Sequence, residues 1–263
     1  MKAMILAAGL GTRLRPLSDD RPKALVEVAG RTMLEIALAR LRAAGVREVI
    51  VNLHHFAGMI LEYLKANDNF GLRIEVSREE VLLDTGGALK QASWFFLENS
   101  NRIEEPFLVH NVDVISTIDL GRMLQFHAGQ QALATLAVQH RETSRYLLFD
   151  EQLQLRGRQS GHDEMPEMVR SSSQSQSQSQ PQAQAQSQPQ ARAFCGIHVI
   201  SPRLLTMMIE EGAFSIIACY LRLAAQGEKI VCFDADEYVW RDLGTPASVS
   251  QAAQEIGSVL KVR

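Results

Sequence analysis

The first half of the chain alternates short, strand-like apolar runs with longer stretches of mixed polarity. The strand-like runs are KAMILAA, REVIVNL, LRIEVS and PFLVHNVDV, at residues 2–8, 47–53, 72–77 and 106–114. Short apolar runs of this kind are typical of strands that are buried within a parallel sheet. The stretches between them are long enough for helical crossovers, so the pattern predicts βαβ units around a mostly parallel sheet.

Helix signals occupy the stretches between these runs. A T-x-x-E capping box begins at Thr32, leucines follow it at helical spacing, and Gly45 marks the end of the helix. We also expect a helix over residues 57–65 and another directly after Gly87. Strands that alternate with helices predict an α/β fold, in which a Rossmann-like, mostly parallel sheet carries helices on both faces.

The second half of the chain has a less regular pattern. Strands are predicted at residues 133–140, 145–150, 194–201 and 229–235, and helices at residues 215–225 and 246–260. The first two of these strands follow each other closely, which leaves no room for a helical crossover between them. We therefore expect a smaller region of mixed and antiparallel pairing beside the parallel sheet.

Residues 171–190 have an unusual composition. They read SSSQSQSQSQPQAQAQSQPQ and contain only Ser, Gln, Pro and Ala. Because the segment has no apolar anchor to offset its chain entropy, we expect a disordered loop. It lies between two strand-like stretches, which favours an insertion at a loop tip of a single domain spanning residues 1–263. A glutamine-rich assembly segment is the alternative interpretation.

Composition narrows the class of protein. The chain has 263 residues, of which 46% are hydrophobic and 22% charged, as in a soluble globular protein with one sizeable core. A net charge of −3 gives no general attraction to nucleic acid or anionic membranes, and no apolar run is long enough to span a bilayer. The three cysteines, Cys195, Cys219 and Cys232, are widely spaced within apolar stretches. They are interpreted as core residues of a cytoplasmic protein. The oligomeric state is not indicated.

A glycine-rich segment, GLGTR at residues 9–13, follows the first predicted strand directly. Such a turn lets backbone N–H groups converge on phosphate oxygens, and Arg13 and Lys23 would then neutralise phosphate charge. The segment is not a dinucleotide-binding G-x-G-x-x-G, because Leu14 stands at the sixth position, and it lacks the Gly-Lys-Ser/Thr of a Walker A loop. A plain turn with surface cations is the alternative.

The longer string LAAGLGTRLRPLSDDRPKALVEVAGRTML, residues 6–34, resembles the signature of the sugar-phosphate nucleotidyltransferases. Members of that family make nucleotide sugars from a nucleoside triphosphate and a sugar 1-phosphate. The resemblance implies the α/β fold of the nucleotide-diphospho-sugar transferases. It also implies that the phosphates are held by Arg13 and Lys23, and the nucleotide by Ala8, Gly9, Gly11 and Thr12.

Two further segments resemble landmarks of the same family in the same order. LLDTGGAL at residues 82–89 is similar to a segment whose backbone approaches the base and ribose, which implies this role for Thr85, Gly86 and Gly87. PFLVHNVDV is similar to a strand that ends in N-G-D. The resemblance implies that Asn111 lies near the sugar phosphate and that Asp113 binds Mg²⁺. Asp113 also closes a predicted parallel strand, where α/β proteins place their ligands.

The last two landmarks belong to the predicted sugar side. FCGIHVIS is similar to a family strand that lies beside the acceptor, which implies that Gly196 is near the sugar. WRDLGTP at residues 240–246 is similar to a segment whose aspartate, here Asp242, is the second metal ligand. Mg²⁺ prefers hard oxygen ligands and commonly takes one or two carboxylates together with substrate phosphates. The ionised oxygen of a sugar 1-phosphate requires no general base, so catalysis would consist of alignment and charge neutralisation.

The chain departs from the family pattern at two places. Val112 stands where the family usually has glycine, and we expect its β-branched side chain to narrow the approach to the ligand. The E-K-P segment that holds the sugar phosphate in many members is not evident. We therefore take Arg141 and Arg145 of HRETSRYLLFD as the candidate sugar-phosphate contacts. No hexapeptide repeat follows WRDLGTP, so the short, monofunctional form is expected.

Three hypotheses remain open on function. The compact length and the D-T-G-G segment resemble N-acetylmuramate 1-phosphate uridylyltransferases most. Mannose-1-phosphate guanylyltransferases share nearly every landmark, so they are the alternative within the family. A hypothesis of a different class is a regulatory protein that binds nucleotide sugars without turnover. Two observations support it: Val112 in place of glycine, and the missing E-K-P segment.

Overall fold

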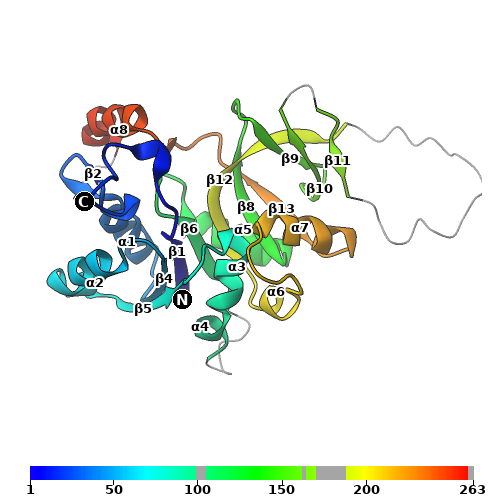
Figure 1. Cartoon of the computed structure of the whole chain (residues 1–263). Helices are drawn as coiled ribbons and strands as arrows, with labels where there is room; N and C mark the ends of the chain where they lie inside the picture. The colour runs from blue at the N-terminus through cyan, green and yellow to red at the C-terminus, as the bar shows by residue number, and fades with distance from the viewer. Residues whose placement is uncertain (99–104, 162–163, 170–187, 260–263) are drawn as a thin grey trace, which may run out of the picture.

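A sheet of ten strands runs through the molecule (Figure 1). The computed structural model describes residues 1–98, 105–161, 164–169 and 188–259. The strands of the large sheet are β1 (Lys2–Leu6), β4 (Glu48–Leu53), β5 (Arg73–Arg78), β6 (Phe107–Asn111), β8 (Ala134–Gln139), β9 (Arg145–Phe149), β10 (Leu155–Ser160), β11 (Glu167–Met168), β12 (Gln190–Ile200) and β13 (Ile230–Asp234).

The N-terminal half of the sheet is parallel, as predicted. Its strand order is β5-β4-β1-β6, and β1 pairs in parallel with both β4 and β6. The chain winds outward from β1 to β5 and then returns to place β6 on the other side of β1. The carboxyl ends of β1 and β6 therefore flank the point where the winding direction changes, which is where open α/β sheets bind their ligands.

Helices cover both faces of this sheet (Figure 1). They are α1 (Met33–Ala43), α2 (Ala57–Ala66), α3 (Asp84–Gln91), α4 (Ser93–Leu97), α5 (Leu120–Gln130), α6 (Arg203–Thr206), α7 (Ile216–Ala225) and α8 (Pro246–Val259). Three short 3₁₀ segments are η1 (Thr12–Leu14), η2 (Lys23–Leu25) and η3 (Asp68–Gly71). Alternate residues of β1 enter two apolar clusters: Ala3 and Ile5 pack with α1, α2, α5 and α8, whereas Met4 and Leu6 pack with the other helices.

The predicted helix boundaries are mostly confirmed. The Thr32 hydroxyl accepts a hydrogen bond from the Glu35 N–H at 3.1 Å and caps α1. The helix expected after Gly87 instead begins at Asp84, so the glycines of the D-T-G-G segment lie within the first turns of α3. Helix α5 was not predicted.

The C-terminal half of the sheet is mixed, as expected, and β12 joins it to the parallel half. β12 is antiparallel to β6 over residues 197–200, to β9 over residues 190–193, and to β8, which pairs in parallel with β13. Residues 194–196 lie between the two stretches that pair with β6 and β9, and Gly196 there has a φ of +72°. β12 thus changes partner at Gly196.

Two small sheets complete the fold. β2 (Glu27–Val28) pairs with β3 (Arg31–Thr32), and β7 (Val114–Ser116) pairs antiparallel with β14 (Trp240–Asp242). The predicted strand over residues 106–114 is therefore interrupted, because the chain leaves β6 at Asn111 and starts β7 at Val114. Residues 171–187 of the Ser/Gln-rich segment lie outside the described residues, and its last residue already belongs to β12.

All three cysteines are free and buried, as predicted. Burial raises the pKa of each thiol to about 12, so all three are protonated and unreactive near neutral pH. Within the described parts of the chain, every helix is too short or too polar to cross a membrane.

Candidate active site

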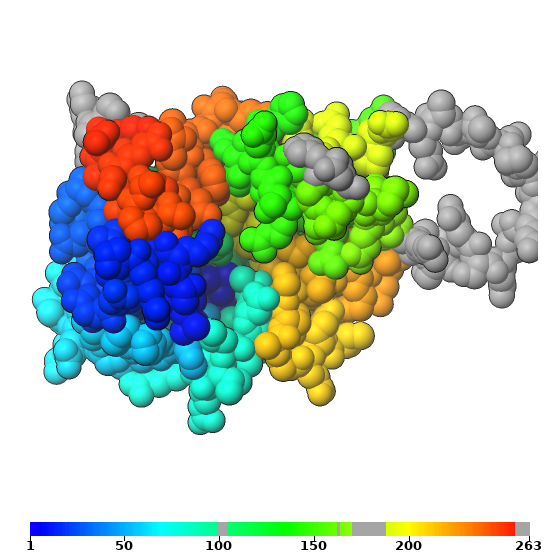
Figure 2. Space-filling model, turned by 45° about the horizontal axis from the view of Figure 1, so that its top comes forward, coloured from blue at the N-terminus to red at the C-terminus, as the bar shows by residue number. Residues whose placement is uncertain are grey.

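Two adjoining cavities open at the carboxyl ends of β1 and β6, with volumes of about 370 and 480 Å³. Figure 2 shows the hollow where the blue N-terminal segment, the cyan and green middle segments and the yellow-to-orange segment meet. Of the predicted site residues, the smaller cavity is lined by Ala8, Gly9 and Lys23, the larger by Arg13, Arg141, Arg145, Gly196 and Asp242, and both by Thr85, Asn111 and Asp113. The predicted Gly11, Thr12, Gly86 and Gly87 lie outside the described walls of both.

The glycine-rich turn after β1 is shaped around Lys23. A Cβ atom placed on Gly9 would lie 3.1 Å from Lys23 Nζ, and one placed on Gly11 would lie 3.1 Å from Lys23 Cβ. Gly11 also has a φ of +66°, and its carbonyl accepts a hydrogen bond from the Ser18 hydroxyl at 2.7 Å. Glycine at both positions leaves room for Lys23 to lie across the turn, and the positive φ of Gly11 favours glycine there as well.

Lys23 and Asp113 form an ion pair across the smaller cavity. Lys23 Nζ lies 2.9 Å from Asp113 Oδ2, and the two side chains are 14% and 16% exposed. The pair joins the segment after the turn to the segment after β6. The Lys23 ammonium group thus binds the Asp113 carboxylate, which is one of the two that the family resemblance assigns to a metal ion.

The two predicted metal-binding aspartates meet through the small β7–β14 sheet. Asp242 stands opposite Val114 in the register, and the Leu243 N–H donates to the Asp113 carbonyl at 2.8 Å. Both carboxylates line the larger cavity. Two segments that are far apart in the sequence therefore bring their acidic side chains to one place.

Arg13 lies beside Asp242, and Gly244 makes room for both. A Cβ atom on Gly244 would lie 2.7 Å from Asp242 Oδ1 and 2.9 Å from Arg13 Nη2. The Gly244 N–H donates to Asp242 Oδ1 at 2.6 Å, which fixes the orientation of the carboxylate. Gly244 was missed as a site residue, although it follows Asp242 within WRDLGTP.

The part of β12 where the strand changes partner lines the larger cavity, at residues 194–196. A Cβ atom on Gly196 would lie 2.7 Å from Asn111 Nδ2, so glycine permits Asn111 to pack against the bend. The carbonyl of Phe194 accepts a hydrogen bond from Arg141 Nη2 at 2.9 Å. The carbonyl of Cys195 accepts one from Trp240 Nε1 at 2.8 Å. The Arg141 guanidinium also lies 3.8 Å from the centre of the Trp240 ring, which holds it in place.

The comparison with known sequences decides the family. The profile of the nucleotidyl transferase family matches residues 2–258. The chain belongs to the nucleotidyl transferase family.

Two curated relatives cover most of the chain. An N-acetylmuramate alpha-1-phosphate uridylyltransferase of Caulobacter vibrioides is 35% identical over 247 residues, which are 93% of this chain and 92% of that protein. A mannose-1-phosphate guanyltransferase of Yarrowia lipolytica is 28% identical over 248 residues, which are 94% of this chain but only 61% of that protein.

Solved structures of other proteins share the fold. A UDP-glucose pyrophosphorylase of Acinetobacter baumanii matches with a TM-score of 0.75 at 18% identity, covering 99% of this chain and 94% of that one. HddC of Yersinia pseudotuberculosis, complexed with GMP-PN, matches with a TM-score of 0.71 at 20% identity, covering 97% and 99%. The nucleotidyltransferase fold predicted from the sequence is therefore confirmed.

In this family member the glycines of the D-T-G-G segment pack against the loop before α7. A Cβ atom on Gly86 would lie 2.3 Å from the Phe214 ring, and one on Gly87 would lie 2.4 Å from the Gly212 carbonyl oxygen. Both glycine N–H groups donate to the Phe214 carbonyl. The structure thus gives Gly86 and Gly87 a packing role, and Thr85 is the member of the trio that lines the cavities.

The expectation that Val112 narrows the ligand approach is wrong. Its side chain is 1% exposed and belongs to the apolar cluster that contains α1. Its N–H donates to the Leu6 carbonyl, which keeps this backbone next to β1. The side chain therefore points into the core. Val112 no longer supports the hypothesis of a regulatory protein without turnover.

Two buried residues, which were not predicted from the sequence, hold the start of the glycine-rich turn by hydrogen bonds. Asn52, at the end of β4, accepts a hydrogen bond from the Ala7 N–H at 2.7 Å and donates one to Glu79 Oε1 at 2.6 Å. Glu79 Oε2 accepts from the Leu83 N–H at 3.1 Å. Asn52 and Glu79 are 3% and 6% exposed and line the smaller cavity. A buried asparagine at the end of a predicted parallel strand was the available signal.

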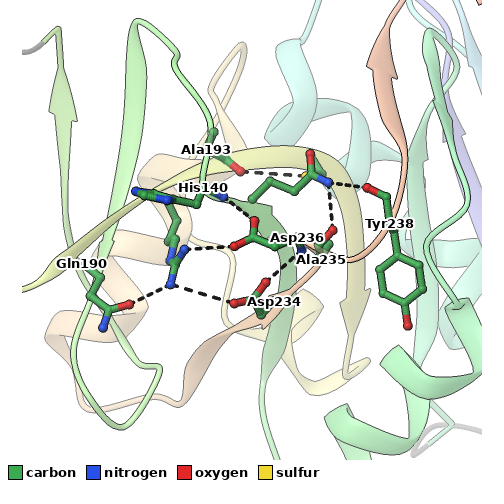
Figure 3. A network of polar contacts seen from close by, with 10 residues as sticks. His140, Gln190, Ala193, Asp234, Ala235, Asp236 and Tyr238 are labelled. Carbon is green, nitrogen blue, oxygen red and sulfur yellow. Dashed lines mark hydrogen bonds and ion pairs between the residues drawn. The ribbon is translucent and has the colours of Figure 1, made fainter.

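A polar network holds the loop that delivers Asp242. Gln139 Nε2 donates to the carbonyls of Ala235 and Tyr238, at 2.8 Å each, and the His140 N–H donates to Asp236 at 2.6 Å (Figure 3). The chain continues from this loop directly into β14. The network therefore fixes where Asp242 enters the cavity.

The histidines near the site are neutral. Burial lowers the pKa of His198, which lines the larger cavity, to about 3, and that of His110 to about 4. His198 Nδ1 shares a hydrogen bond with the Tyr220 hydroxyl at 2.8 Å. Both imidazoles are therefore uncharged near neutral pH.

Proposed function

We propose that this chain transfers a nucleotidyl group from a nucleoside triphosphate to a sugar 1-phosphate, with release of pyrophosphate. The observation that carries the proposal is the meeting of Asp113 and Asp242 through β7 and β14, with Arg13 and Lys23 beside them. Membership of the nucleotidyl transferase family supports the same reaction class. We further propose that residues 1–263 form a single nucleotidyltransferase domain.

The residues of the chain have separate tasks in this reaction. The glycine-rich turn and Asn52 would bind the triphosphate over the end of β1, and Arg13 and Lys23 would neutralise charge on the triphosphate and the departing pyrophosphate. Asn111 and Gly196 would position the sugar 1-phosphate. Its phosphate oxygen is already ionised and attacks the α-phosphorus in line with the leaving group, so the site needs alignment and no general base.

The donor set fits a divalent cation. Asp113 and Asp242 offer hard oxygen ligands in one cavity, and Mg²⁺ commonly binds through one or two carboxylates plus phosphates and water. Among the described residues no group of three or more His, Cys, Asp or Glu could hold a metal by itself, so the site requires the substrate phosphates. Held by Asp113 and Asp242, Mg²⁺ would supply positive charge to those phosphates. Lys23 must then leave Asp113 and turn toward the phosphates.

For the substrates we favour UTP and N-acetylmuramate 1-phosphate. The support is the relative from Caulobacter vibrioides, which matches over nearly its whole length at 35% identity. The second candidate is transfer of a guanylyl group to mannose 1-phosphate, because the Yarrowia lipolytica protein matches 94% of this chain.

Pyrophosphate release over a substrate panel tests the proposal. Purified protein with Mg²⁺ is given each of UTP, GTP and dTTP together with N-acetylmuramate, N-acetylglucosamine, glucose or mannose 1-phosphate. We expect release that depends on both substrates and is fastest with UTP and N-acetylmuramate 1-phosphate. Fastest release with GTP and mannose 1-phosphate would favour the second candidate. No release from any pair would contradict the enzyme activity, and calorimetric binding without turnover would then indicate a regulatory protein.

A further inference from the structure

Part of the wall of the larger cavity is formed by the β9–β10 hairpin. In the sheet, β12 separates this hairpin from β6 and β1 (Figure 1). Arg145 stands opposite Ser160 in the register, and Leu147 stands opposite Arg158. Because alternate residues of a strand share a face, these four side chains lie on one face of the hairpin. All four line the cavity.

Arg145 and Arg158 are diagonal neighbours on this face. Diagonal neighbours across an antiparallel pair are about 7–8 Å apart, which long side chains span easily. Arg158 is paired with Glu167, at 2.6 Å between Nε and Oε2. Arg145 forms no ion pair with any residue that the structure describes. The two guanidinium groups can therefore reach one ligand group, and Arg145 has charge left for it.

The chemistry of arginine restricts what that ligand group is. A guanidinium only donates hydrogen bonds, and its planar fork matches a carboxylate or a phosphate. Neutral sugar hydroxyls, in contrast, need acceptors as well as donors. The phosphates of both proposed substrates already have Arg13 and Lys23, which lie beside Asp242 and Asp113. The hairpin wall is therefore suited to a second anionic group, on the sugar itself.

Resting on the proposed function, we propose that Arg145 and Arg158 bind a carboxylate carried by the sugar, and that the acceptor is an acidic sugar 1-phosphate. N-acetylmuramate has such a group in its lactyl ether, and N-acetylglucosamine is the same sugar without it. The sequence analysis took Arg141 and Arg145 together as candidate sugar-phosphate contacts. The Arg141 guanidinium, however, stacks on Trp240 and donates to the Phe194 carbonyl. Arg141 therefore stays with the sugar phosphate, whereas Arg145 reads the carboxylate.

Kinetics with the two matched sugars test the assignment. We expect wild-type protein to prefer N-acetylmuramate 1-phosphate over N-acetylglucosamine 1-phosphate. Arg145→Gln and Arg158→Gln are each expected to lower kcat/KM for N-acetylmuramate 1-phosphate by about tenfold to a hundredfold, the value of a lost charged hydrogen bond. The same variants are expected to lower kcat/KM for N-acetylglucosamine 1-phosphate far less, because that sugar has no carboxylate contact to lose, so the preference disappears.

The controls separate this assignment from other causes. Arg203→Gln removes an exposed arginine that is paired with Glu228 at 2.6 Å, as Arg158 is with Glu167, but lies on α6 outside both cavities. It should change neither substrate. Arg145→Lys keeps the charge and is expected to recover part of the preference. Equal losses on both sugars, or no loss on either, would overturn the proposal, and circular dichroism identifies a variant that fails to fold.

A binding measurement keeps the inference apart from the proposed reaction. If wild-type protein releases no pyrophosphate, calorimetry with the two sugar 1-phosphates still compares their affinities. Tighter binding of N-acetylmuramate 1-phosphate that is lost in Arg145→Gln supports the carboxylate contact without any turnover. Equal affinities would overturn the contact, even if nucleotidyl transfer to another sugar is observed.

Discussion

The two halves of the sheet build the site in different ways. In the parallel half the candidate functional residues lie at or just after the ends of strands: Gly9 follows β1, Asn52 is the second-last residue of β4 and Asn111 is the last residue of β6. In the antiparallel half they lie on the face of a hairpin or where a strand changes partner, as Arg145 and Gly196 do. Strand ends fix a site through topology, whereas a strand face fixes it only through register.

This difference has a chemical counterpart. The parallel half supplies backbone amides and an Asp–Lys pair, which suit the phosphates that all the proposed reactions share. The antiparallel half supplies arginines on the face of the β9–β10 hairpin, which suit the part of the substrate that differs between sugars. We therefore expect damage to the first half to abolish the reaction, and damage to the second half to change its sugar specificity.

The largest expected effect is at Asp242, on β14, which pairs with β7 directly after Asp113. Asp242→Asn removes one of the two carboxylates but keeps the shape of the side chain and an acceptor for the Gly244 N–H. We expect kcat/KM to fall by about a hundredfold to a thousandfold for every sugar, as for other lost transition-state contacts. Pyrophosphate release measures the loss. Asp234→Asn, on the exposed end of β13, is the control, and activity within about threefold of wild type in Asp242→Asn would contradict the metal-binding role.

The next largest effect is expected at the bend of β12. Gly196→Ala adds a methyl group 2.7 Å from Asn111 Nδ2 at a φ of +72°. Asn111 must move, so we expect KM for the sugar 1-phosphate to rise by about tenfold or more, with about 1–3 kcal/mol lost from the free energy of unfolding. Gly227→Ala has a φ of +88° with nothing within 4 Å, so it carries the strain without the contact. An equal rise of KM in both variants would show that strain alone is responsible.

The sequence predicted the parallel half better than the antiparallel half, for a physical reason. A buried apolar strand followed by glycines is a local pattern, so β1 and its turn could be found from it, while Lys23 and Asp113 were found from the resemblance to short family signatures, which are also local in the sequence. The change of partner along β12 depends on which strands pair at residues 190–193 and 197–200, and this pairing is not local. Arg158 was missed because its strand, β10, was not predicted. Val112 was misjudged because its side-chain direction depends on the break between β6 and β7.

A smaller effect is expected below the glycine-rich turn. Asn52→Ala leaves the buried Ala7 N–H and Glu79 without their partner. We expect KM for the nucleoside triphosphate to rise by about tenfold while KM for the sugar 1-phosphate stays the same, at a cost of about 1–3 kcal/mol in stability. Asn67→Ala, which removes an exposed asparagine, is the control. A rise of KM for the sugar alone would mean that Asn52 does not belong to the nucleotide half.

The smallest effect on activity is expected at Val112, where the family usually has glycine. Its side chain is buried in the core below β1, so Val112→Gly opens a cavity and adds backbone freedom. We expect about 2–4 kcal/mol of lost stability in urea unfolding, while kcat/KM stays within about twofold of wild type for both sugars. Val112→Ala should lose less stability and also leave kcat/KM unchanged. A gain in activity in the glycine variant would mean that the valine obstructs the substrate, and the parallel half would then also contribute to specificity.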